Sequence, residues 1–140
     1  MSIQNGEQLR LMKIVIPIPP RTKKNSQQII MVKGKYGKMR PAIIPSKAYK
    51  AFEKECLPYL KHVEPFLSPC NVKCEYFMPT RRKVDLVNLQ EATLDILVRA
   101  GILIDDNSNV VVSMDGSRVH YDKGNPRTEI EITEVKEWED

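Results

Sequence analysis

The sequence predicts an α+β fold, a mixed α/β arrangement in which two main helices pack on a mixed sheet. Three observations lead to this prediction. Residues 84–106 carry an amphipathic helical stripe, residues 70–78 alternate between apolar and polar side chains, and short apolar runs of strand length lie on both sides of them. With 140 residues and 41% hydrophobic composition, the chain can bury a core. We expect residues 1–140 to form a single domain, with residues 1–10 flexible.

The first expected elements are strands. Residues 11–18 are apolar, and Pro17 indicates an edge strand or a strand end. A polar, basic loop follows at 21–26. Two short strands, 28–33 and 38–44, then flank a Gly-Lys-Tyr-Gly turn, which predicts a hairpin.

A first helix is expected after this hairpin. Ser46 is the expected N-cap, because a serine hydroxyl can accept a hydrogen bond from the first turn. Pro58 should kink or end the helix, since proline has no backbone N–H. The expected apolar stripe comprises Tyr49, Phe52, Cys56, Tyr59 and Leu60.

The central helix is the strongest prediction. Asp85 and Asn88 fit a cap or first turn, where the exposed N–H groups and the positive dipole end suit an acid. Gly101 is the expected stop, in the left-handed conformation that glycine tolerates best. The buried stripe is expected to comprise Leu86, Leu89, Thr93, Ile96, Leu97 and Ala100. Strands at 110–114 and 128–135 complete the order β-ββ-α-β-α-β-β, with a short apolar stretch between them.

Charge is distributed unevenly along the chain. Residues 8–52 contain eleven lysines and arginines and no acid, whereas the C-terminal residues are rich in glutamate. Such a basic stretch favours binding to a polyanion, because phosphate contacts supply most of the non-specific affinity for nucleic acid. A lysine-rich surface that is merely solvated is the alternative.

Three cysteines, an odd number, indicate reduced thiols in a cytoplasmic protein. Cys70 and Cys74 are four residues apart, but only two histidines accompany them, so buried thiols are favoured over a zinc site. The first residues lack a signal-peptide pattern. No apolar run has a transmembrane length, so no membrane association is expected.

Acidic residues frame the central helix. Asp85 begins it, Asp105 and Asp106 follow it, and these carboxylates could converge if the segment after the helix folds back. Carboxylates with water and substrate phosphates are the ligands that Mg²⁺ prefers, and bound magnesium supports phosphodiester hydrolysis. Each acid also has a plainer role, as a helix cap for Asp85 and as turn residues for Asp105, Asp106 and Asp115.

The segment Met78-Pro-Thr-Arg-Arg-Lys-Val-Asp-Leu-Val-Asn-Leu-Gln-Glu-Ala-Thr-Leu-Asp95, followed by Gly101 and Ile104-Asp105-Asp106, resembles the RusA family of Holliday junction resolvases. The similarity extends to 16–20 with Asn25, to 46–49 and to 128–134. The resemblance implies a RusA-like fold and a homodimeric, Mg²⁺-dependent endonuclease, often prophage-encoded, with Mn²⁺ as a substitute ion. It implies symmetric nicking of four-way DNA junctions in recombination and repair. Asp85 and Asp106 correspond to motif aspartates, and Asp105 lies beside the second.

Two positions depart from the family pattern. Val87 stands where the family has its second aspartate, and Glu91 stands where it often has a catalytic lysine. Glu91 lies one helical turn from Val87, so its carboxylate could reach toward the missing ligand. Asp115 is the other candidate for this role. The departures leave open a relative that binds junctions without cleaving them.

The metal set expected from the resemblance is therefore Asp85, Asp105 and Asp106, with Glu91 or Asp115 as further catalytic acids. Basic and polar residues near the motif are expected to contact DNA phosphates, which positions the DNA without reading its sequence. These residues are Lys23, Lys24, Asn25, Arg81, Arg82, Lys83 and Arg118. Since a junction is two-fold symmetric, a C2 dimer would present two sites to it.

Overall fold

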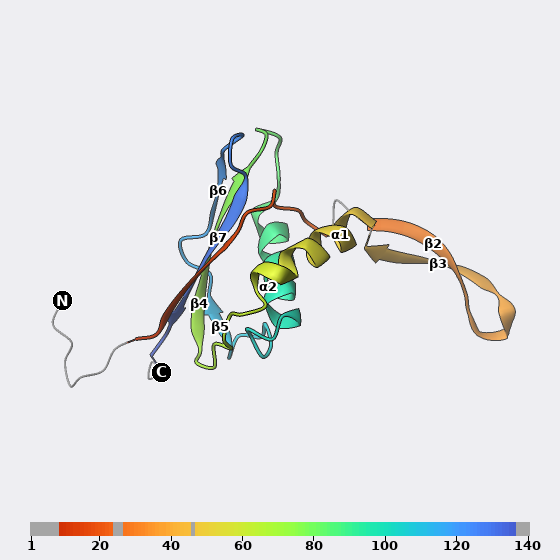
Figure 1. Cartoon of the computed structure of the whole chain (residues 1–140). Helices are drawn as coiled ribbons and strands as arrows, with labels where there is room; N and C mark the ends of the chain where they lie inside the picture. Colours follow the sequence, from red (N-terminus) through yellow and green to blue (C-terminus); the bar gives the residue numbers. More distant parts are fainter. Residues whose placement is uncertain (1–8, 24–26, 46, 137–140) are drawn as a thin grey trace.

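The computed structural model describes residues 9–23, 27–45 and 47–136. Figure 1 shows a body, in which both helices cover one face of a sheet, and a two-stranded ribbon that projects from it. The predicted mixed sheet with two helices is confirmed. The elements are β1 (Leu11–Ile16), β2 (Gln27–Lys33), β3 (Met39–Pro45), α1 (Lys47–Cys56), β4 (Cys70–Met78), α2 (Leu86–Arg99), β5 (Val111–Ser113), β6 (Arg118–Tyr121) and β7 (Arg127–Glu134).

β4 is the central strand of the sheet. It runs antiparallel to β7, and β7 pairs antiparallel with β1 on its other side. The remaining edge of β4 pairs in parallel with β5 near Cys70 and with β6 at residues 75–78. β6 was predicted only as a short apolar stretch, because four residues give too little alternation to identify a strand.

The core lies between the sheet and the two helices. The alternation predicted for 70–78 is confirmed, because Val72, Cys74 and Tyr76 are buried while the residues between them are partly exposed. The Tyr76 hydroxyl donates a hydrogen bond to Thr93 Oγ1 (2.7 Å), and Thr93 in turn donates to the carbonyl oxygen of Leu89 (2.9 Å). This chain of bonds satisfies the polar groups that join β4 to α2.

The predicted limits of the central helix are confirmed. Asp85 is the N-cap of α2, and Gly101 follows the helix with a left-handed φ of +77°. In α1, Tyr49, Phe52 and Cys56 are buried as expected, and a short 3₁₀ turn containing Pro58 follows at residues 57–59. The inclusion of Tyr59 in the stripe was wrong, because the helical period ends at this turn and the side chain is 49% exposed. Ser46 lies outside the described residues.

The three cysteines are buried and free, as predicted. Burial raises the pKa of Cys70 to about 11 and that of Cys56 and Cys74 to about 12, so the thiols stay protonated near neutral pH. Among the described helices, none has the length and apolar character needed to span a bilayer.

Candidate active site and nucleic-acid interface

The β4–α2–β5 unit separates the acids around the central helix. Because β4 and β5 are parallel, α2 runs back from the carboxyl end of β4 toward its amino end. Asp85 therefore lies at one end of α2 and the Asp105–Asp106 pair beyond the other. The 14 residues of α2 span about 21 Å at about 1.5 Å per residue. The expectation that these acids converge within one chain is therefore wrong.

Asp85 caps the amino-terminal end of α2. Its Oδ1 accepts a hydrogen bond from the backbone N–H of Val87 (2.9 Å), and its own backbone is extended. The exposed N–H groups and the positive dipole end favour a carboxylate here. Its Oδ2 has no hydrogen bond or ion pair to the described part of the chain, so it is available to a cation.

A groove of about 330 Å³ opens beside Asp85, between the segment after β1 and the loop after β4. Arg21, Arg82 and Lys83 line it together with prolines and Met78, and none of its lining residues is acidic. This basic lining suits a phosphate, and it ends at Val84, the residue that precedes Asp85 in the chain. Sequence reasoning named Arg82 and Lys83 but missed Arg21, whose signal was its place at the start of the basic loop 21–26.

Two further cations that the sequence singled out lie near β6. The Arg81 guanidinium lies over the ring of Tyr121, with its central carbon 4.2 Å from the ring centroid. Arg118 begins β6 and is exposed, opposite Glu75 in the parallel register with β4. Neither arginine forms an ion pair with another described residue.

Lys23 has a different setting. It forms an ion pair with Asp95 of α2 and lies 5.8 Å from the centroid of the Tyr49 ring. Its charge is already partnered, and it ties the segment after β1 to both helices. Lys24 and Asn25 lie outside the described residues.

Val87 and Glu91 both project from the exposed side of α2. The Val87 side chain is 61% exposed in the first turn of the helix. Glu91 is also exposed, one turn further along. The expected spacing of Glu91 from Val87 is thus present, and Glu91 has no ion pair or hydrogen bond to the described residues.

The two acids beyond α2 differ from each other. Asp105 Oδ1 accepts a hydrogen bond from the backbone N–H of Asp106 (2.8 Å), and its Oδ2 accepts one from Asn107 Nδ2 (2.9 Å). These two bonds, that of the backbone N–H first, lower the pKa of Asp105. Asp106 is exposed, and its carboxylate makes no such bond within the described chain. Asp105 shapes the turn, whereas Asp106 is free to bind a ligand.

Asp115 lies at the connection between β5 and β6. Its backbone N–H donates to Asn71 Oδ1 (2.8 Å), and its carbonyl oxygen accepts from Asn71 Nδ2 (3.2 Å). Asn71 is near the amino end of β4, whereas Val87 follows its carboxyl end. The structure therefore does not bring Asp115 to the position of the missing ligand at Val87 within one chain.

No group of three or more His, Cys, Asp or Glu side chains in residues 9–23, 27–45 and 47–136 is placed to hold a metal ion. Asp85 and Asp106 have the right chemistry for Mg²⁺, since both offer free carboxylate oxygens. Their separation along α2 prevents one chain from using both on a single ion.

The comparisons with known proteins bear on this site. The family described as Endodeoxyribonuclease RusA matches residues 15–133, which include the groove and both ends of α2. The chain is 40% identical over 67 residues to the crossover junction endodeoxyribonucleases RusA of Escherichia coli K12 and of Enterobacteria phage 82. The match covers 48% of this chain and 53% of each relative, so the chain spans about half the length of the curated relatives it matches.

The match also confirms the resemblance drawn from the motif at 78–106. It extends over most of the chain and includes the free acids and the basic groove that the structure places around α2. The chain therefore belongs to the endodeoxyribonuclease RusA family.

Proposed function

We propose that this chain is a Mg²⁺-dependent endodeoxyribonuclease that nicks four-way DNA junctions in recombination and repair. The observation that carries this proposal is the open carboxylate of Asp85 beside a groove lined by Arg21, Arg82 and Lys83, in a member of the RusA family. The curated relatives named above are crossover junction endodeoxyribonucleases, which supports the same substrate class. Mn²⁺ is the expected substitute ion.

The acting form in this proposal is a homodimer that completes the metal site. A C2 dimer with its two α2 helices antiparallel would bring Asp85 of one protomer to Asp106 of the other, twice. Two exposed aliphatic residues, one in the first turn of α2 and one in the segment after its last residue, support this arrangement. Val87 is 61% exposed and Ile104 is 70% exposed, and each would be covered where opposite helix ends meet.

Each residue has a stated part in this mechanism. Asp85 Oδ2 and the Asp106 carboxylate would hold the ion, while Asp105 keeps the turn that presents Asp106. Bound Mg²⁺ supplies a Lewis acid that activates water and stabilises the leaving oxygen. Arg82 and Lys83 contact the phosphates next to the scissile one, which fixes the DNA without reading its sequence.

Val87 supports a second candidate, a relative that binds junctions without cleaving them. One acid of the family motif is absent, and the exposed Val87 side chain cannot bind a cation. Glu91 is placed to compensate, since its exposed carboxylate lies one turn along the same helix. Cleavage of a synthetic junction in Mg²⁺, in Mn²⁺ and in EDTA separates the two candidates.

A mixing experiment tests the composite site directly. Asp85→Asn and Asp106→Asn should each reduce the nicking rate by about 10²–10³-fold, and asparagine at 85 keeps the helix cap. After subunit exchange, the mixed dimer would contain one site with both aspartates and one with neither. We expect nicking of a single strand of the junction to return in this mixture. No recovery, in a sample whose mixed dimers are verified by differential tagging, would overturn the composite site.

The same assay tests the function itself. Paired nicks on the four-way junction, but not on a linear duplex, are expected for the wild-type protein when a divalent ion is present. Tight junction binding without cleavage under either ion would contradict the nuclease and favour the binding relative. Absence of both binding and cleavage would reject both candidates.

A further inference from the structure

The β2–β3 ribbon is a projecting arm with little support from the body. Its seven residue pairs run from Gln27–Pro45 to Lys33–Met39, and its strands pack extensively only on each other (Figure 1). At about 3.3 Å per residue, each strand reaches about 23 Å. An isolated two-stranded hairpin is marginally stable in water, so binding to a partner would stabilise the arm.

The charge of the arm identifies the class of partner. Lys33, Lys35, Lys38 and Arg40 are all exposed in its distal half, and none of them forms an ion pair within the described chain. No Asp or Glu occurs from residue 8 to residue 52. Two such arms facing each other would bring together eight positive charges, which disfavours a second copy. A polyanion offsets them instead.

The tip of the arm presents an aromatic ring. Tyr36 is 98% exposed between Lys35 and Lys38, and its backbone has the left-handed φ of +61°. The bond from the Gly34 N–H to the Lys38 carbonyl oxygen (2.7 Å) closes this turn. An aromatic ring between cations suits stacking on an unpaired or splayed base, because every base offers a π-face.

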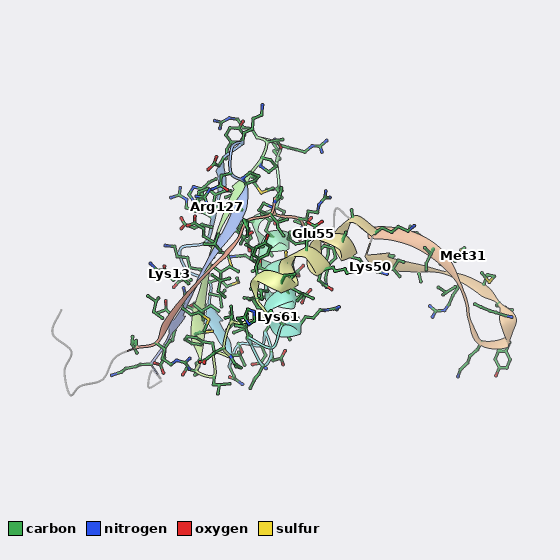
Figure 2. The ribbon with its side chains drawn as sticks, in the orientation of Figure 1. Lys13, Met31, Lys50, Glu55, Lys61 and Arg127 are labelled. Atoms are coloured by element: carbon green, nitrogen blue, oxygen red, sulfur yellow. The ribbon has the colours of Figure 1, made fainter. Side chains whose placement is uncertain are left out.

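One face of the arm is apolar. Ile29, Met31 and Ile43 are 71%, 56% and 67% exposed and project from the same side of the ribbon, because Ile29 pairs with Ile43. Met31, labelled in Figure 2, lies on the arm well away from the body. A two-stranded ribbon fits the major groove of DNA, about 12 Å wide, and apolar side chains of this kind also contact bases in bent duplexes.

We propose that the β2–β3 ribbon is a DNA-binding arm that grips a duplex beside the branch point of the substrate. Its lysines contact phosphates, its apolar face lies in the groove, and Tyr36 stacks on a base exposed at the branch. This inference rests on the proposed function, since it takes branched DNA as the substrate. It extends that function by assigning substrate recognition to a part of the chain remote from the acids.

Binding without cleavage tests the arm. The affinity for a fluorescent four-way junction and for a linear duplex is measured by anisotropy in EDTA, over a range of salt concentrations. Tyr36→Ala should weaken junction binding about tenfold and duplex binding by less than threefold. The pair Lys35→Gln and Lys38→Gln should reduce the slope of log K against log salt by about 2 on both substrates, at about 0.9 per phosphate contact.

Matched controls come from the body. Tyr59→Ala removes an aromatic ring that is 49% exposed, and the pair Lys54→Gln and Lys61→Gln removes two exposed lysines (Lys61 is labelled in Figure 2). These variants should bind both DNAs as the wild type does. Arm variants that bind within twofold of the wild type, with an unchanged salt slope, would overturn the proposal.

Two further readouts separate the possible failures. If arm variants convert a dimer into monomers in sedimentation, the arm is an interface between copies and the proposal is wrong. If the wild type binds junctions through the arm but never nicks them, the arm proposal is supported and the proposed nuclease function is wrong. If the wild type nicks junctions and the arm variants bind normally, only the arm proposal fails.

Discussion

The two ends of α2 carry acids in opposite settings. At the amino end, Asp85 uses one carboxylate oxygen as a cap and leaves the other open beside a basic groove. At the carboxyl end, both oxygens of Asp105 are bonded within a tight turn, and only Asp106 is free. The difference shows that neighbouring acids can have different local roles, because hydrogen bonds within the turn engage both carboxylate oxygens of Asp105 but not those of Asp106.

The largest expected effect contrasts Asp106 with its neighbour. Asp106→Asn should lower the Mg²⁺-dependent nicking rate by about 10²–10³-fold, the typical cost of removing one preorganised charge-stabilising group. Asp105→Asn keeps one acceptor for the turn and should cost less than tenfold. Single-turnover cleavage of a four-way junction measures both. Equal losses would show that the two acids act as one unit.

Position 87 offers a way to add a carboxylate at the amino end of α2. Val87→Asp restores the carboxylate of the family motif and places an acid in the first turn of α2, where the dipole favours it. We expect the nicking rate to rise about tenfold, equal to about 1.4 kcal/mol of barrier. Val87→Asn is the control, because asparagine has nearly the same shape as aspartate but carries no charge. A rate that does not change would mean that Glu91 already fills this role.

Glu91→Ala completes that comparison. If Glu91 compensates for Val87, its removal should weaken cleavage in the wild type but have little effect in the Val87→Asp background. Such non-additivity is expected only for groups that share one site.

Gly101→Ala tests the backbone conformation at the carboxyl end of α2 through its effect on the stability of the protein. A Cβ at this position would meet no atom within 4 Å, so the cost of Gly101→Ala arises from the left-handed φ of +77° alone. We expect a loss of about 1–2 kcal/mol in the free energy of unfolding. Urea denaturation followed by circular dichroism measures it, and an unchanged midpoint would contradict the assigned conformation.

The smallest effect concerns the cap. Asp85→Ala removes the acceptor for the Val87 N–H and should cost about 1 kcal/mol, whereas Asp85→Asn should cost a few tenths. For a chain of this size, about 1 kcal/mol corresponds to about 3 °C in the melting temperature. Equal melting temperatures for the two variants would show that the cap bond does not stabilise the helix.

Patterns of local periodicity predicted much of the fold. The limits of β4 and the cap and stop of α2 follow from side-chain alternation and from residues with one preferred backbone role. Tyr59 was misplaced because a proline broke the period on which its assignment depended. Residues 28–33 and 38–44 were identified as a hairpin, but no local pattern indicated that this hairpin would stand apart from the main sheet.

The sequence named candidate acids for the site but not their arrangement in space. Asp85 and Asp106 followed from the motif, yet their separation depends on whether β4 and β5 are parallel. Parallel pairing was available as an inference, because a strand, a helix and a strand in succession usually form a crossover unit. The hydrogen bonds to the Asp105 carboxylate could not be inferred from the sequence, because they depend on the turn geometry at Asn107.

The ribbon leaves the body and returns to it at one place, because Gln27 and Pro45 are paired across its base. Lengthening or shortening it by whole residue pairs therefore leaves the end points where they are, and the body tolerates such changes. The length of the ribbon can then change during evolution without changes to the core of the body. Members of this family that meet DNA branches of different geometry would be expected to differ first in the length of this segment, and a chimaera that exchanges only the ribbon should fold.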